Sequence, residues 1–272
     1  MLNHILIKAK RQVFSEHLGT NLSPMKGEGY DFIELREYEY GEDIKKIDWT
    51  TSAKLQKPYV KVYHDTKELN IVISCMLGGS VLFGTSNTKQ ETIAQISALL
   101  GFSSIKQNDP FSYHFYTSKN IQYTKPNKQI FSVNKMVENI LSFNPKNHIS
   151  DYKYMAHDLF SKIKNKSLIF IIGDFLNEFD LKLLSTKHEV IAIVVRDKFE
   201  ENPLSIDEIN MIDPSTNKNY NTSLNTNTIK KYKTKIIEND NKMTEHFRQN
   251  NIKWCKVYTN QDPIISLRKL FI

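Results

Sequence analysis

The sequence predicts an α/β protein with a doubly wound, mostly parallel sheet, because strand-like apolar runs alternate with helical patterns after about residue 66. Three runs are apolar almost without interruption, as expected of strands that are covered on both faces. They are Leu69–Met76, Ser167–Ile172 and Glu189–Val195. The change of periodicity divides the chain into an N-terminal extension, residues 1–66, and a domain, residues 67–272.

The other elements follow from periodicity and from turn residues. Apolar positions at helical spacing predict helices over residues 1–18, 88–105, 131–143, 150–163, 176–184, 229–250 and 263–270. Strands are predicted over residues 58–64, 111–116, 121–123 and 254–257. Residues 202–225 are rich in Asn, Ser, Thr and Pro, which indicates an irregular or short hairpin excursion.

Composition narrows the class of protein. The net charge of +7 and the pI near 9.1 suggest nucleic acid as a ligand. However, the lysines are scattered, and no segment combines Arg with aromatics at base-stacking spacing, so this is the third hypothesis. The apolar runs are too short to span a membrane, and the N-terminus has no signal-peptide cleavage site. Cys75 and Cys255 lie in apolar runs and are expected to be buried thiols, which favours the cytoplasm.

Residues 27–54 combine acidic, basic and aromatic side chains without a strand or helix period. Charged hydrogen bonds usually hold such segments together, so we expect an irregular surface in this region. Arg36 is expected to pair with Asp43 or Asp48, and Trp49 is expected to be buried, because its ring would not be left in water.

This segment resembles the signature of the bacterial domain of unknown function 58 proteins. The matches are Gly27, Gly29, Phe32, Leu35, Arg36, Tyr38, Gly41, Asp43, Ile47, Asp48, Trp49, Ser52 and Ala53. Glu42, Lys45 and Lys54 depart from the pattern, and a lysine cannot make the planar two-point contact of an arginine. The resemblance implies a von Willebrand factor A-like domain after an N-terminal segment, and a MoxR-type AAA+ ATPase as partner.

The resemblance also implies a divalent-cation site at the carboxyl ends of the strands. The family pattern places Met76 at the first Asp and Gly78 at the first Ser, and it leaves Ser80, Ser150 and Asp174 as oxygen donors. A thioether and a glycine cannot replace hard oxygen ligands, so we expect a degenerate site without a metal. Two alternatives remain open: a magnesium site that uses Ser80, Ser150 and Asp174, with Asp151 as a substitute ligand, and an Asp174 that only caps the next helix.

No catalytic constellation is visible in the sequence. The eight histidines are scattered, and only His64, next to Asp65, stands near the signature. Neither a phosphate-binding loop nor a nucleophile elbow occurs. The sequence therefore predicts a non-enzymatic interaction module that works with an ATPase on a client complex. The candidate interaction residues are Arg36, Tyr38, Asp43, Lys45, Lys46, Asp48 and Trp49.

Overall fold

The computed structural model describes residues 1–15, 32–42, 44, 47–63 and 69–270. Its contacts divide the chain into a smaller unit, Ser23–Glu68, and a larger unit, Met1–Leu22 with Leu69–Ile272. The division at 68/69 lies close to the expected boundary at 66/67. The first helix, α1 (Leu2–Ser15), belongs to the larger unit, because its buried apolar residues join that unit's core.

The larger unit is built on a six-stranded sheet in the order β10-β7-β6-β3-β4-β5. Five neighbouring strands are parallel and β5 is antiparallel to β4. The strands are β3 (Ile71–Met76), β4 (Phe111–Tyr116), β5 (Asn120–Tyr123), β6 (Leu168–Gly173), β7 (Glu189–Arg196) and β10 (Lys253–Tyr258). Every residue of β3, β4 and β6 is buried, as the continuous apolar runs in β3 and β6 indicate.

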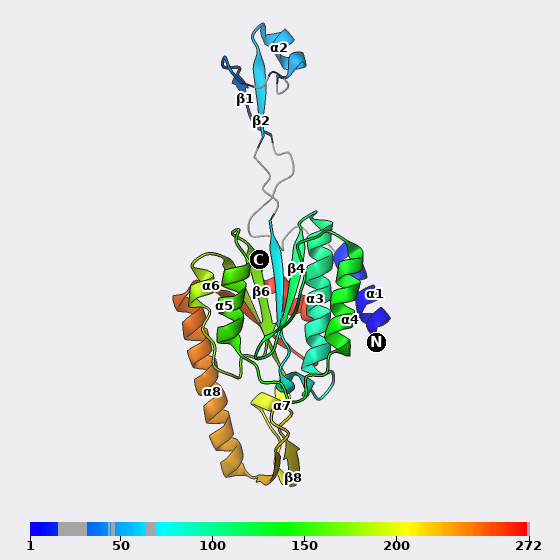
Figure 1. Cartoon of the computed structure of the whole chain (residues 1–272), viewed down its shortest axis with the longest axis vertical. Coiled ribbons are helices and arrows are strands. Elements are labelled where there is room, and N and C mark those ends of the chain that lie inside the picture. Colours follow the sequence, from blue (N-terminus) through cyan, green and yellow to red (C-terminus); the bar gives the residue numbers. More distant parts are fainter. Residues whose placement is uncertain (16–31, 43, 45–46, 64–68, 271–272) are drawn as a thin grey trace. The chain divides into compact units, whose positions relative to one another are not determined.

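Helices cover both faces of this sheet, which makes two apolar layers (Figure 1). One layer is formed with α1, α3 (Lys89–Lys106), α4 (Ile130–Ser142) and α9 (Pro263–Leu270). The other is formed with α5 (Tyr152–Lys162), α6 (Lys182–Ser185) and the C-terminal part of α8 (Thr226–Gln249). This is the predicted α/β architecture, with a mostly parallel sheet and a helical layer on each face.

Helix α3 is the central helix of its layer, because α1 and α4 both pack against it. It begins with a capping box, in which the Thr88 hydroxyl accepts from the Glu91 N–H and the Glu91 carboxylate accepts from the Thr88 N–H. The cap fixes the position of Lys89, the first residue of α3, at the carboxyl edge of the sheet.

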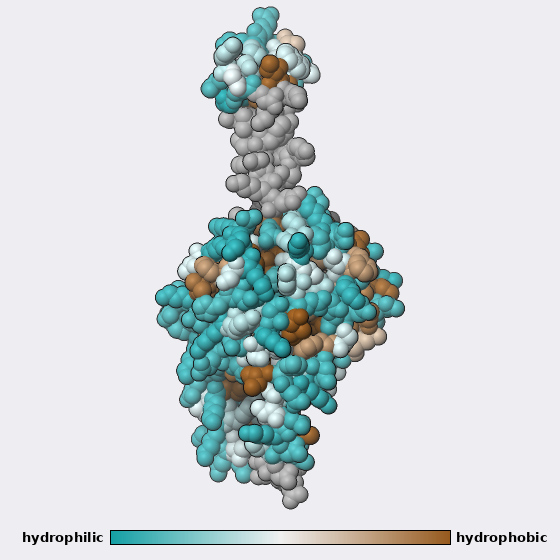
Figure 2. Space-filling model, in the orientation of Figure 1, coloured by the Kyte–Doolittle hydropathy of each residue, from teal (hydrophilic) through white to brown (hydrophobic). Residues whose placement is uncertain are grey.

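Residues 198–249 form the part of the larger unit that departs most from the sheet-and-helix pattern. They comprise α7 (Lys198–Glu201), the antiparallel pair β8 (Ile206–Ile212) and β9 (Asn219–Leu224), and the long helix α8. Only Met243 and Phe247 of α8 are buried, and both lie in its last third. On the face seen in Figure 2, the surface of the larger unit is mostly hydrophilic, with isolated hydrophobic patches.

The prediction of a helix over residues 176–184 was wrong for residues 176–181, because α6 comprises only Lys182–Ser185. Tertiary contacts hold residues 176–181 in a non-helical conformation. The Leu181 N–H donates to His246 Nε2 of α8 at 3.1 Å, and the Phe179 ring packs on Phe247 with 5.7 Å between centroids. Phe175, the residue before this segment, has a left-handed φ of 51°.

The smaller unit contains regular structure that the sequence did not predict. Strand β1 (Phe32–Glu37) pairs antiparallel with β2 (Tyr59–Tyr63), and the helix α2 (Trp49–Leu55) lies between them in the chain. The expectation of an irregular segment over 27–54 was therefore wrong for these residues. Strand β2 was predicted, and its hydrogen-bond ladder pairs with the backbone of β1.

Asp48 is the N-cap of α2. The backbone N–H groups of Thr50 and Thr51 donate to its Oδ1 at 3.2 and 3.4 Å, and the Thr51 hydroxyl donates to its Oδ2 at 2.7 Å. Asp48 therefore satisfies N–H groups at the start of a helix.

We predict that Asp48→Ala destabilises α2 by about 1 kcal/mol, the usual effect of removing an N-cap acceptor. Hydrogen exchange at the α2 amides of the full chain measures this change. Asp48→Asn is the matched control, because an amide oxygen also caps helices. An equal loss of protection in both variants would contradict the capping role.

Candidate functional site

The candidate site lies where β3 and β6 end at the carboxyl edge of the sheet. The chain continues from β3 to β4 on one side and later to β6 on the other, so these two strands flank the switch point of the topology. Ligands of open α/β sheets bind at such points. Asp174 follows β6 directly and is 2% exposed, and Ser80, which follows β3, hydrogen-bonds to the Asp174 carboxylate.

Lys89 fills this site with a side-chain cation. Its Nζ lies 3.1 Å from Asp174 Oδ2 and 2.6 Å from Glu200 Oε1, and its side chain is completely buried. The two carboxylates come from different segments, Asp174 after β6 and Glu200 in α7. A buried ammonium between two carboxylates is favourable only with such close geometry, because desolvation of the charges is costly.

Tyr152 of α5 closes the site from the opposite face of the sheet. Its hydroxyl accepts from the Phe175 N–H at 2.9 Å and lies 3.4 Å from Asp174 Oδ1. Burial, followed by the nearby Asp174 charge, raises the pKa of Tyr152 well above its usual value. A Cβ on Gly173 would lie 2.3 Å from this hydroxyl, so the contact requires a glycine at the end of β6.

Asp174 is held in its charged form. Burial alone would raise the pKa of its carboxyl, but the Lys89 ammonium, the Ser80 hydroxyl and the Arg196 guanidinium together lower the pKa below its usual value. Asp174 also accepts from the Leu176 N–H at 3.4 Å. It does not cap the next helix as the simpler reading expected, because α6 begins only at Lys182.

The three expected oxygen donors, Ser80, Ser150 and Asp174, lie around this edge of the sheet. A Cβ on Gly78 would lie 2.2 Å from Ser150 Oγ, so Gly78 and Ser150 are in close contact, and Met76 is buried in the core. Asp151 is the N-cap of α5 and accepts from the Tyr154 N–H at 2.8 Å. The described role of Asp151 is therefore to cap α5, and no described contact joins it to Asp174.

A divalent cation does not fit this donor set. The carboxylate that would bind it already contacts the Lys89 ammonium, and Met76 offers a thioether where a hard cation needs oxygen. Among the described residues, no group of three or more His, Cys, Asp or Glu side chains could hold a metal ion. The cation that contacts Asp174 is therefore one that the chain itself supplies.

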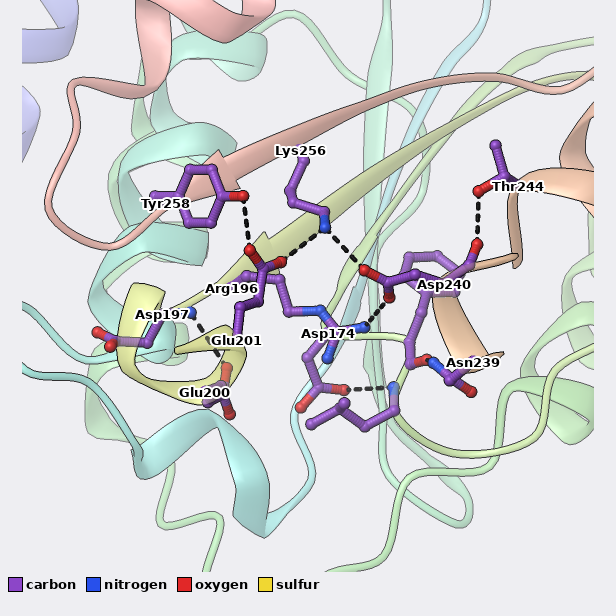
Figure 3. A network of polar contacts seen from close by, with 12 residues as sticks. Asp174, Arg196, Asp197, Glu200, Glu201, Asn239, Asp240, Thr244, Lys256 and Tyr258 are labelled. Atoms are coloured by element: carbon purple, nitrogen blue, oxygen red, sulfur yellow. Dashed lines mark hydrogen bonds and ion pairs between the residues drawn. The ribbon is translucent and has the colours of Figure 1, made fainter. Parts of the chain in front are cut away.

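A second polar network adjoins the site and joins the ends of β7 and β10 to α7 and α8 (Figure 3). Asp240 of α8 accepts from Arg196 and from Lys256, each at 2.8 Å. Glu201 accepts from Lys256 at 2.6 Å and from the Tyr258 hydroxyl at 2.8 Å. Arg196 is completely buried, and its Nε and one terminal nitrogen have no hydrogen-bond partner in the described part of the chain.

The signature residues lie in the other unit. Arg36 pairs with carboxylates, as expected, and its described ion pairs are with Glu42 and with Glu39, the latter at 3.3 Å. The Tyr38 hydroxyl donates to the Glu42 carbonyl at 3.2 Å. Asp43, Lys45, Lys46 and His64 lie outside the described residues.

The prediction that Trp49 is buried was wrong, because its side chain is 66% exposed. Trp49 is the first residue of α2, and Ser52 is the one residue of that short helix that is buried. A unit of this size has too little interior to cover every aromatic ring. Other large apolar side chains exposed in the described part of this unit are Leu35, Tyr40, Ile44 and Leu55.

Sequence reasoning missed Lys89, Glu200, Tyr152 and Arg196. One local signal was available, because Asp197 and Glu200 form a capping box at the start of α7 with the spacing that such boxes require. The residues Lys89 and Asp174 are 85 positions apart, so their pairing depends on the fold and has no local signature.

Comparison with known proteins places the chain in a family. The family described as "Protein of unknown function DUF58" matches residues 34–242. The chain belongs to this family. The match begins in β1 and ends within α8, so the DUF58 region includes most of the signature, the Lys89 site and most of the α7–α8 segment.

Individual relatives match more weakly. Proteins of Mycobacterium tuberculosis (strain H37Rv) and Mycobacterium bovis, both described as uncharacterized, are 28% identical over 80 residues, which is 29% of this chain and 25% of theirs. The match thus spans about a quarter of the length of these curated relatives. In the part of this DUF58 chain that the structure describes, no helix is long and apolar enough to cross a membrane.

Two solved structures are weakly similar to this chain. BatB, a conserved hypothetical protein from Bacteroides thetaiotaomicron, is 12% identical with a TM-score of 0.44, over 74% of this chain and 95% of that one. An aerotolerance-related membrane protein from Bacteroides fragilis is 13% identical with a TM-score of 0.43, over 75% and 96%.

We predict that Lys89→Met destabilises the chain by about 3–5 kcal/mol, because it leaves Asp174 and Glu200 without the buried ammonium that pairs with both. Chemical denaturation measures the change in the free energy of unfolding. Lys135→Met is the matched control, because it breaks the exposed pair with Glu138 and should cost less than about 1 kcal/mol.

Neutralising the carboxylates as well provides a second arm. The triple variant Lys89→Met, Asp174→Asn, Glu200→Gln should recover most of the lost stability, since no buried charge remains unpaired at these three positions. If Lys89→Met is no more harmful than Lys135→Met, the buried ion pair does not hold this site together.

Proposed function

We propose that this chain is a non-enzymatic protein-interaction module whose larger unit is von Willebrand factor A-like. We further propose that it works beside a MoxR-type AAA+ ATPase in the maturation or remodelling of a client complex. The partner follows from the family resemblance, and the mode of binding follows from the site. The single observation that carries the proposal is the buried Lys89 ammonium beside Asp174 and Glu200.

The Lys89 contact supports binding that does not use a metal. In the metal-dependent mode, an acidic side chain of the partner completes the coordination of a divalent cation, which requires open oxygen donors. Here a tethered ammonium neutralises Asp174 and is itself inaccessible from solvent. A partner carboxylate would therefore find neither an ion nor an exposed cation at this position.

The smaller unit, which contains the signature residues, is a better candidate for the partner surface than the Lys89 site. It exposes Trp49 and Tyr40, and aromatic side chains of this kind dominate the energetics of many protein interfaces. Arg36 is fixed by two carboxylates of the same loop, which would present it in a defined geometry. The predicted interaction residues thus belong to a unit that is separate from the Lys89 site.

Cation binding tests the first part of the proposal. We predict no calorimetric heat of binding for Mg²⁺ at millimolar concentration, because Lys89 neutralises the one buried carboxylate of the expected donor set. Met76→Asp with Lys89→Ala should create affinity by adding an oxygen donor and removing the ammonium. Gly78→Ser is left out, because its Cβ would collide with Ser150.

A one-to-one exothermic event in the unmodified chain that is lost in Asp174→Ala would favour the alternative function. That alternative is a magnesium-dependent binding domain that uses Ser80, Ser150 and Asp174. Binding that appears in Lys89→Ala alone would show that the ammonium is the main obstacle.

Partner capture tests the second part. We predict that Trp49→Ala with Tyr40→Ala lowers co-purification of a MoxR-type ATPase from the native cell by about tenfold or more, as loss of interface aromatics does. Phe131→Ala, on α4 of the larger unit, is the matched control because its ring is 70% exposed. Capture should be unchanged by EDTA added to the chain before the ATPase and its nucleotide are supplied.

Charge reversal at Lys45 and Lys46 extends this test to signature residues outside the described ones. If capture is lost in Asp174→Asn or after EDTA treatment but survives every signature variant, the interface lies at the switch point. The proposed mode of binding would then be wrong.

A further inference from the structure

We propose that the outward face of α8 is a docking surface for an acidic segment of a partner protein. The surface consists of the lysine row Lys231, Lys235 and Lys242, whose residues are all exposed. They are spaced i, i+4 and i+11, so they lie along one side of the helix over about 16 Å. In Figure 2 the surface of α8 is predominantly hydrophilic.

The positive charge of this surface is concentrated. Residues 226–237 contain four lysines within six positions, Lys230, Lys231, Lys233 and Lys235, and no acidic residue. The net charge of the whole chain is +7, so these six positions hold more than half of the excess. Such a concentration distinguishes α8 from the scattered lysines elsewhere in the sequence.

Among the described residues, no ion pair within 4.0 Å uses a lysine of α8, although the Lys242 charge, after that of Lys153, helps to lower the pKa of Glu178. The ion pairs that α8 makes there use Asp240, Glu245, His246 and Arg248 instead. Asp240 joins α8 to the sheet through ion pairs with Arg196 and Lys256, and its carboxylate is therefore already paired. Within the row, Lys231 and Lys235 therefore present charge to solvent that no described ion pair neutralises.

This arrangement works against the helix itself. Lys231 and Lys235 are like charges at i, i+4, which destabilise a helix by a few tenths of a kcal/mol. The lysine-rich half is N-terminal and the acidic residues Glu238, Asp240 and Glu245 follow it, which is the reverse of the order that the helix dipole favours. Carboxylates from a partner would relieve both effects at once.

An acidic protein segment fits this surface better than a membrane or a nucleic acid. The large apolar side chains that α8 exposes are Tyr232 and Ile237, which is too few for an apolar face that inserts into lipid. Tyr232 is the one aromatic residue among the lysines of residues 230–235, whereas nucleic-acid surfaces stack bases on several rings. The row contains no arginine for bidentate contacts with bases.

The test uses the full chain and a labelled helical peptide with glutamates at the spacing of the row. A second peptide of the same composition has its glutamates rearranged to different faces. Fluorescence anisotropy should show that the matched peptide binds more tightly, and that binding weakens with added salt. Lys231→Glu with Lys235→Glu should weaken binding of the matched peptide by about tenfold, since two exposed ion pairs become repulsions.

Two measurements separate docking from net charge and from misfolding. Lys164→Glu with Lys166→Glu, which changes the charge equally at exposed positions outside α8, should leave peptide binding within about twofold at moderate salt. Hydrogen exchange should show α8 about as protected in Lys231→Glu with Lys235→Glu as in the unmodified chain, because one like-charge pair at i, i+4 replaces another.

Three results would overturn the proposal: equal affinity for both peptides, equal weakening by the Lys164 and Lys166 variant, or tighter binding of a DNA duplex or phosphatidylglycerol vesicles that depends on the same row. The outcome is independent of the ATPase experiment. Failure of the peptide test leaves the signature surface untouched, and failure of ATPase capture leaves the lysine row untouched.

Discussion

The ion pairs of Lys89 are the constraint on which the carboxyl edge of the larger unit depends. They join the first residue of α3 to the segment after β6 and to α7, three parts of the chain that are distant in sequence. Because α3 is also packed between α1 and α4, the ammonium fixes the central helix of one layer relative to the switch point of the sheet. Lys89 is the first-named of the groups that offset the burial of Asp174 and keep the pKa of that carboxyl below its usual value.

The sequence predicted the parts of the fold in which local pattern and burial agree. The fully buried strands β3 and β6 and the central helix α3 were placed within about two residues, because their apolar runs have only one good interpretation. Residues 176–181 were misassigned because contacts with His246 and Phe247 outweigh their helical pattern. The ladder between β1 and β2 was missed because the mixed charges of β1 conceal the alternation of an edge strand.

The candidate site was predicted only in outline. The family pattern pointed to Ser80, Ser150 and Asp174, and the structure brings them to the same edge of the sheet, but the cation that neutralises Asp174 was not foreseen. In the sequence, Lys89 is one lysine of many at the start of a helix, and nothing local marks it as buried. Trp49 failed for the opposite reason: ring size suggested burial, but its position as the first residue of a short helix in a small unit leaves it exposed.

The path of the chain makes the smaller unit an insertion, since α1 before it and β3 after it belong to the same larger unit. The smaller unit is therefore covalently joined at both of its ends. A single proteolytic cut on either side would leave it attached, and α1 would stay docked through its buried residues Ile5, Ala9 and Val13. Removal of this unit from the folded protein would require two cuts. Neither cut would fall within a strand of the six-stranded sheet or within a helix packed on it.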